Sequence, residues 1–230
     1  MDPMRHHAPP AGFMELIRAE CDKYGIILIF DEITIGWWHC FGGSHLSFGV
    51  NPDIAVFAKA PGNGHPIGAI IGTTEAMSGF SRSFISSTYW TERVGPAAAL
   101  ATIAKMEKSN AAKYVNDFGG KMMAVWTELG TKHQVKLHTN SDVGCLASFA
   151  FDYLNANAIR TLYTQLMLEH GFLAGCVIYP TLSHNDEILN KFTESADAVF
   201  AQLAKAISQN LVESSLRGPV AHTTFQRLIK

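Results

Sequence analysis

The sequence has few cysteines, no long apolar run and no excess of charge of either sign. Its four cysteines, Cys21, Cys40, Cys145 and Cys176, are widely spaced among 230 residues and form no CxxC pair. That pattern is typical of reduced thiols and argues against a disulfide framework. The longest apolar runs, such as IILIF at 26–30, are far too short to cross a bilayer.

Charge and composition exclude further classes of function. The formal net charge of −2 shows no bias toward nucleic acid or an anionic membrane surface. With 47% hydrophobic and 17% charged residues, the chain has the composition of a folded globular protein. The opening stretch MDPMRHHAPPAGF lacks the apolar segment of a secretory signal. We therefore expect a cytoplasmic protein without nucleic-acid or membrane partners.

The first part of the chain alternates between helix and strand patterns. Apolar residues recur at helical spacing from Phe13 to Tyr24, and Gly25 is well placed to end that helix. Three apolar runs predict strands, the first of them a buried parallel one: 26–30, 54–58 and 66–72. This order predicts part of an α/β layered domain.

The pattern changes after Pro96. An alanine-rich stretch predicts two helices, broken around Ser109-Asn110 or around Gly119-Gly120. Four further elements are predicted beyond residue 133: a strand at 145–151, a helix at 156–170, an extended run at 171–179 and an amphipathic helix at 185–208. We expect a first domain over 1–132 and a compact α+β domain over 133–230.

Three polar features follow the predicted strands, where open α/β sheets usually build their sites. Asp31 ends the first strand, Lys59 ends the second, and the hydroxyl-rich run Ser81–Thr91 precedes the helix after Pro96. Taken singly, each has an ordinary interpretation as a capping carboxylate, a solvated lysine or a polar loop. Together they supply an anion, an amine and phosphate donors, the three groups that a pyridoxal-phosphate (PLP) site needs. A binding module for another phosphorylated ligand explains the pairing of Asp31 with Lys59 poorly.

Four segments resemble the class III (ω-type) aminotransferase family over nearly the whole chain. LIFDEITIGW at 28–37 resembles the family motif LxxDEVxTGF, and PDIAVFAKAPGNGHPIGAIIG at 52–72 resembles PDIxxxxKxxGxGxPxGAxxG. STYWTERVGPAAALATI at 87–103 resembles the T-x-x-x-N-P segment, with Gly95 in place of asparagine. YPTLSHNDEI at 179–188 resembles the SxxHTxEDI region of glutamate-1-semialdehyde aminomutase-like members.

The resemblance implies a fold and a set of roles. The fold is that of a fold type I PLP-dependent transferase, with part of a large mixed-sheet domain followed by an α+β small domain. Asp31 would keep the pyridine nitrogen protonated, and Ile33 would pack against the ring. Lys59 would form the Schiff base and move the proton at the substrate Cα. Thr91 would bind the phosphate of the neighbouring subunit's cofactor, which implies a homodimer.

The implied activity is amino-group transfer between an amine or amino acid and an oxo acid or aldehyde. An aminomutase would use the same lysine and aspartate, and a truncated remnant without catalysis is a third interpretation. The family carries a long N-terminal half ahead of the aspartate strand, with a turn that cradles the phosphate and an aromatic ring that stacks on the pyridine. Neither is present here, so we expect weak or absent PLP affinity for this chain alone.

The family often has an arginine two residues after the motif glycine, whereas Gly36 is followed here by Trp37 and Trp38. Any salt bridge that this arginine makes in relatives is therefore lost.

Several other polar residues have structural interpretations. His39, Cys40 and His45 match no usual zinc spacing, so no metal site is expected. Glu32 and Glu92 could touch substrate or cofactor loops, but we expect both to be structural or solvated.

Overall fold

The computed structural model describes residues 1–4, 7–89, 91–139 and 142–222. The chain divides into two compact units, Met1–Asn116 and Asp117–Lys230. The division lies within helix α5 (Ala111–His133), upstream of the domain boundary expected at 132/133. Within the described ranges, no helix has the length and apolarity needed to cross a membrane.

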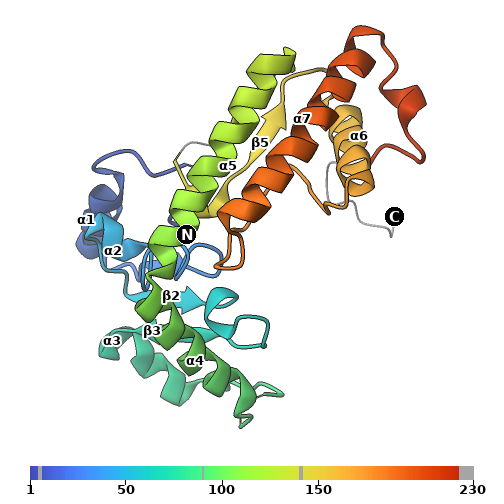
Figure 1. Cartoon of the computed structure of the whole chain (residues 1–230). Coiled ribbons are helices and arrows are strands. Elements are labelled where there is room, and N and C mark those ends of the chain that lie inside the picture. Colours follow the sequence, from blue (N-terminus) through green and yellow to red (C-terminus); the bar gives the residue numbers. More distant parts are fainter. Residues whose placement is uncertain (5–6, 90, 140–141, 223–230) are drawn as a thin grey trace. The chain divides into compact units, whose positions relative to one another are not determined.

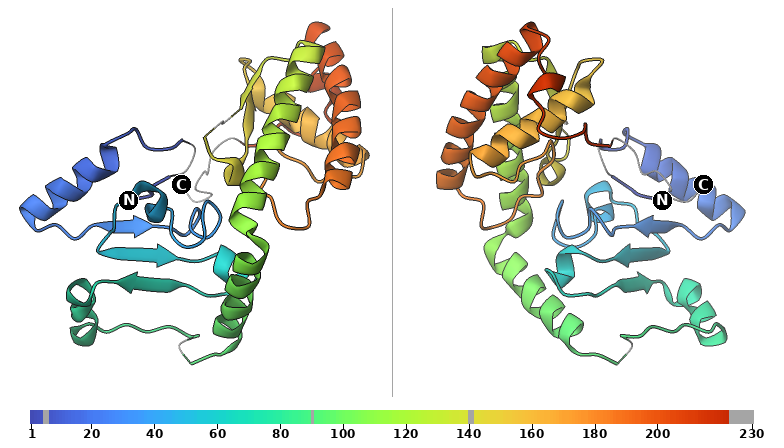
Figure 2. Two further views of the ribbon diagram at one scale, coloured as in Figure 1. Left: turned by 60° about the vertical axis from the view of Figure 1, so that its left-hand side comes forward. Right: turned by 90° about the vertical axis from the view of Figure 1, so that its right-hand side faces the viewer.

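The first unit contains a three-stranded mixed sheet, as the sequence predicted (Figure 2). Strand β2 (Ile54–Phe57) lies between β1 (Ile29–Asp31) and β3 (Ala69–Gly72). β1 runs parallel to β2, with Asp31 opposite Val56, whereas β3 is antiparallel to β2. Because β1 and β2 are parallel, the residues that follow them emerge at the same edge of the sheet.

Helix α1 (Phe13–Tyr24) packs on one face of this sheet. It ends, as predicted, at Gly25, whose φ of 64° suits a residue without Cβ. Its buried residues form a small core with strand residues: Met14, Cys21, Leu28, Phe30 and Val50. The opposite face is only partly covered, since Ile29 is 43% and Ile70 50% exposed. The first strand is parallel, as predicted, but the prediction that it is buried was wrong for one face, because α1 covers one face and strand side chains alternate between two.

The remaining helical elements of the first unit are short, except for α4. They are α2 (His45–Phe48), η1 (Ala60–Gly62), α3 (Thr74–Met77), η2 (Ser78–Arg82) and α4 (Val94–Ser109). Asn110, with φ 48°, ends α4, and α5 begins at Ala111. The predicted break at Ser109-Asn110 is confirmed. The alternative at Gly119-Gly120 was wrong, because Gly119 lies inside α5 and lets it approach the Gly144 carbonyl oxygen, which a Cβ would strike.

The second unit packs helices on a two-stranded antiparallel sheet (Figure 1). Its further elements are β4 (Leu137–Thr139), η3 (Gly144–Leu146), β5 (Phe149–Phe151), α6 (Ala156–Glu169), α7 (Asp186–Ser208) and η4 (Glu213–Ser215). Aromatic rings fill its core, with Phe149 between Trp126 and Tyr163 at centroid distances of 4.8 and 5.5 Å. The predicted strand at 145–151 divides into η3 and β5. The extended run at 171–179 contributes a single bridge, between Ser148 and Val177.

Candidate functional site

Asp31 and Lys59 lie at the same edge of the mixed sheet. Asp31 is the last residue of β1, and Lys59 comes two residues after the end of β2. The Asp31 side chain is exposed, and its Oδ1 accepts a hydrogen bond of 3.0 Å from the Ile33 N–H. The parallel pairing thus brings together two of the groups that the sequence singled out, with the half-buried Ile33 beside them.

Lys59 has an unusual backbone conformation. Its φ of 57° and ψ of −90° lie in a region that side chains with a Cβ rarely adopt. Its carbonyl oxygen accepts hydrogen bonds from the N–H groups of Gly62, at 3.1 Å, and Asn63, at 3.2 Å. The exposed Nζ donates to Thr34 Oγ1 at 2.9 Å. Such strain, about 1–3 kcal/mol, persists where the surroundings fix the residue, and it is common at functional sites.

Glu32, the neighbour of Asp31, is fully buried and structural. Its carboxylate accepts hydrogen bonds from Ser44 N–H at 2.9 Å, Ser44 Oγ at 3.0 Å and His45 N–H at 3.1 Å, and it faces His45 Nδ1 at 3.1 Å. Several donors are what a buried carboxylate requires. Sequence reasoning missed Ser44; the available signal was a serine just before a short helix.

The three residues considered for zinc have other environments. Within the described part of the chain, no three His, Cys, Asp or Glu side chains are grouped so that they could hold a metal. Burial lowers the pKa of His39, although the nearby Glu32 acts in the opposite direction. Burial and Glu32 both raise the pKa of the Cys40 thiol, which donates to the Gly43 carbonyl oxygen at 3.0 Å.

Trp37 and Trp38 follow Gly36, and Trp38 stands where the family often has an arginine. Trp37, with φ 69°, donates its N–H to the Gly42 carbonyl oxygen at 2.6 Å. Its ring lies edge-on to Phe41 and Phe57, at centroid distances of 5.0 and 6.4 Å. The carbonyl oxygen of Trp38 accepts a hydrogen bond of 3.2 Å from the Asn116 side chain.

Thr91 is exposed and precedes helix α4. Within the described ranges, no hydrogen bond joins Thr91 to Asp31 or Lys59. The carboxylate of Glu92 caps α4, accepting hydrogen bonds from Val94 N–H at 2.6 Å and Gly95 N–H at 2.7 Å. Glu92 is therefore structural, as expected. Because it already binds these two amides, they are not free to bind a phosphate.

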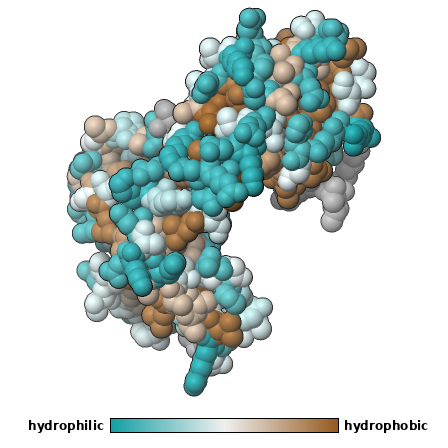
Figure 3. Space-filling model, in the orientation of Figure 1, coloured by the Kyte–Doolittle hydropathy of each residue, from teal (hydrophilic) through white to brown (hydrophobic). Residues whose placement is uncertain are grey.

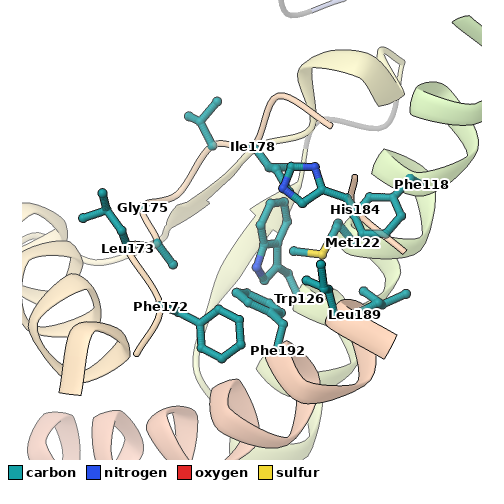
Figure 4. A pocket seen from close by; sticks show the side chains of 13 residues that line it. Phe118, Met122, Trp126, Phe172, Leu173, Gly175, Ile178, His184, Leu189 and Phe192 are labelled. Atoms are coloured by element: carbon teal, nitrogen blue, oxygen red, sulfur yellow. The ribbon is translucent and has the colours of Figure 1, made fainter. Parts of the chain in front are cut away.

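A separate pocket of about 160 Å³ lies within the second unit (Figure 4). Phe118, Met122 and Trp126 line it from α5, and the His184 ring lies 5.5 Å from that of Phe118. Burial lowers the pKa of His184. Sequence reasoning missed this pocket, although apolar residues spaced four apart at 118, 122 and 126 signal a helix face that packs or binds.

The groups at the sheet edge suit the cofactor that the sequence suggested. A carboxylate and an amine, both exposed and not paired with each other, extend from adjacent parallel strands. A carboxylate and an amine are two of the chemical groups that a PLP site needs. The hydroxyl of Thr91 remains the predicted donor to the phosphate. The carboxylate, amine and hydroxyl present are therefore of the chemical types that bind PLP.

Comparison with known proteins agrees with this chemistry. The family model described as "Aminotransferase class-III" matches residues 5–200. Glutamate-1-semialdehyde 2,1-aminomutase 2 of Lysinibacillus sphaericus is 29% identical over 214 residues, covering 86% of this chain and 49% of that protein. The 3-aminobutyryl-CoA aminotransferase of Cloacimonas acidaminovorans is 30% identical over 207 residues, with 86% and 49% covered. The chain spans about half the length of these curated relatives.

Solved structures share the fold at lower identity. The FumI protein of Sphingopyxis sp. MTA144, solved in its PLP internal aldimine form, has a TM-score of 0.80 at 20% identity, covering 85% of this chain and 48% of that one. An omega-transaminase from Sphaerobacter thermophilus has a TM-score of 0.76 at 23% identity, with 89% and 51% covered. The predicted fold type I architecture is confirmed.

Proposed function

This chain belongs to the class-III aminotransferase family, and from this premise we propose that it serves in PLP-dependent transfer of an amino group. The partners would be an amine or amino acid as donor and an oxo acid or aldehyde as acceptor. One observation carries the proposal: Asp31 and Lys59 extend from adjacent parallel strands, and Lys59 is held in a strained backbone conformation. The chain spans about half the length of its relatives. The activity of the complete enzyme is therefore itself proposed.

Each residue would have one task. Bound PLP would supply an electron sink for the substrate Cα. The Asp31 carboxylate would hold the proton on the pyridine nitrogen, and Ile33 would pack against the ring. The Lys59 amine would bind the cofactor aldehyde and move a proton to or from the substrate Cα. The Thr91 hydroxyl would donate a hydrogen bond to the cofactor phosphate.

The experiment is to mix the purified chain with excess PLP, record the absorbance spectrum, reduce with borohydride and map the modified peptides. Because weak affinity is expected for this chain alone, PLP is added to saturation, and we expect a weak Schiff-base absorbance band with reduced cofactor on Lys59. Lys59→Ala should abolish the band, whereas replacing Lys105, an exposed lysine of α4, should leave it unchanged. Cofactor spread evenly over several lysines would contradict the proposal.

An aminomutase is the nearest competing activity, since one curated relative carries that name at 29% identity. The two activities differ in whether the amino group leaves the molecule. A transferase supplied with an amino donor alone should stop after one turnover per site and resume when an oxo acid is added. Sustained turnover of a single substrate would instead assign a mutase.

We also propose a homodimer in which Thr91 serves the partner's cofactor. A mixture of Lys59→Ala and Thr91→Ala chains tests this, because each mixed dimer then has one site with both residues intact. With random exchange of subunits, about a quarter of all sites should regain the cofactor binding of the wild-type chain. A mixture no better than the separate variants, or a monomer in sedimentation equilibrium, would refute the dimer.

We further propose a cytoplasmic location. All four cysteines are free thiols in the structure, as expected in a reducing compartment. Cell fractionation with an antibody against the chain would test this, and recovery from an oxidising compartment would contradict it.

A further inference from the structure

Thr34 contacts the amine of the residue on which the proposed function rests. We propose that Thr34 is the positioning residue of Lys59: its hydroxyl oxygen accepts a hydrogen bond from Nζ at 2.9 Å and holds the amine at the sheet edge. Neither residue is near the other in sequence, since 25 positions separate them. The inference depends on the proposed function only for what the amine does, and the contact can be tested without cofactor.

The turn that carries Thr34 is fixed against the end of β2. Glu32 N–H donates to the Val56 carbonyl oxygen at 2.9 Å, and Gly36 N–H donates to the Glu32 carbonyl oxygen at 2.9 Å. Gly36 also packs so closely that a Cβ there would lie 2.8 Å from the Phe57 ring. The half-buried Thr34 therefore cannot move far from the residues that follow β2.

The Lys59 backbone is fixed from the other side. Its carbonyl oxygen accepts two hydrogen bonds from Gly62 and Asn63, and its strained dihedral angles set the direction in which the side chain leaves the chain. Only the rotatable bonds of the Lys59 side chain can still change the position of the amine. A single acceptor at their end is enough to select one position of the amine.

The chemical nature of the acceptor is important. Within the described residues, no carboxylate lies within ion-pair distance of Lys59, so a neutral hydroxyl is its partner. A carboxylate would hold the amine in an ion pair, whereas a hydroxyl orients it through a single hydrogen bond. Thr34 thus suits a lysine that must be placed accurately and still react.

The test is the acylation rate of Lys59 in the cofactor-free full chain. A limiting amount of an amine-selective acetylating reagent is added, and peptide mass spectrometry compares Lys59 with the exposed Lys105 of α4. Without its acceptor the amine is freed, so Thr34→Val and Thr34→Ala should raise the ratio about two- to fivefold, the effect of one modest hydrogen bond. Thr34→Ser keeps the hydroxyl and should retain the wild-type ratio.

Two results would overturn the proposal: an unchanged ratio in both variants without the hydroxyl, or an equal rise in Thr34→Ser, which would assign the effect to methyl packing. Thermal unfolding of each variant controls for a loosened turn, and unaltered melting with a raised ratio supports positioning. Failure of wild-type PLP trapping on Lys59 would remove the proposed function, whereas the acylation ratio would still decide the role of Thr34.

Discussion

At the scale of single residues, backbone geometry separates Lys59 from an ordinary surface lysine. Its side chain is exposed, which alone would favour the solvated interpretation. Its positive φ of 57° and its hydrogen bond to Thr34 are not expected of such a residue. A positive φ is uncommon in residues other than glycine, and it is retained where neighbouring contacts impose it.

This strain predicts a difference between two substitutions at position 59. Lys59→Ala removes the amine but keeps a Cβ in the disfavoured region, whereas Lys59→Gly relieves the strain. We expect Lys59→Gly to be about 1 kcal/mol more stable than Lys59→Ala in urea unfolding. Equal stability, or a more stable alanine variant, would show that the conformation is not strained.

Gly95 stands where the family has asparagine, and close packing explains the replacement. A Cβ at this position would lie 2.7 Å from the Pro66 carbonyl oxygen and 2.6 Å from Glu92 Oε1. We expect Gly95→Ala to lower the free energy of unfolding by about 1–3 kcal/mol through overpacking. Gly120→Ala in α5 is the matched control, because no atom lies within 4 Å of its Cβ, and it should stabilise the chain by about 0.5–1 kcal/mol. Urea unfolding measures the free energy of unfolding of both variants. A change of the same sign in both would contradict this argument.

At the scale of elements, Asp53 connects helix α1 to the start of the sheet through hydrogen bonds. Its Oδ2 accepts hydrogen bonds from Leu28 N–H at 2.7 Å and from Arg18 at 3.0 Å. Burial alone would raise the pKa of Asp53, but the Leu28 N–H and the Arg18 charge together hold it below its usual value. The same arginine also pairs with the exposed Asp22 at 2.6 Å.

The lowered pKa predicts a pH-dependent contribution to stability. The charged form of Asp53 stabilises the fold above its unfolded-state pKa of about 3.9, and this contribution is lost as the pH falls through the lower folded-state value. Asp53→Asn should therefore lose about 1–3 kcal/mol at pH 7, and its deficit should shrink below about pH 4. Asp22→Asn is the control, at about 0.5 kcal/mol or less. Urea unfolding at several pH values measures both, and a deficit independent of pH would contradict the argument.

At the scale of the whole molecule, apolar side chains lie at the surface of the part that contains α1–α4 (Figure 3). Strand alternation and register place Ile29, Ile54, Val56 and Ile70 on the sheet face opposite the α1 core. The outer residues of this group, Ile29 and Ile70, are 43% and 50% exposed. Exposed apolar patches of this kind promote association.

We expect this face to drive association that increases with concentration. Ile70→Glu should reduce light scattering of concentrated solutions severalfold, because it places a charge within the apolar group. Ile71→Glu is the matched control: Ile71 is 60% exposed but points to the other face, so its replacement should have little effect. Equal effects of both substitutions would show that the apolar face is not the cause.

The sequence by itself determined the order of the main helices and strands, but not the division of 145–151 into η3 and β5. Helical periodicity with Gly25 after it defined α1, and apolar runs ending in Asp31 and Lys59 marked β1 and β2. These signals are local, since spacing and terminal residues act within a few positions of the chain. Motif order also identified the family, which the match over residues 5–200 confirmed.

Only the tertiary structure decided how those elements use their side chains. Parallel pairing brought Asp31 and Lys59 to one edge, and packing of the turn after β1 placed Thr34 against the Lys59 amine. The pairing of buried Glu32 with Ser44, and the one-sided cover of β1, likewise emerged only from the tertiary structure. Such contacts join residues 12 or more positions apart, so they depend on register, packing and burial, which local residue patterns do not specify.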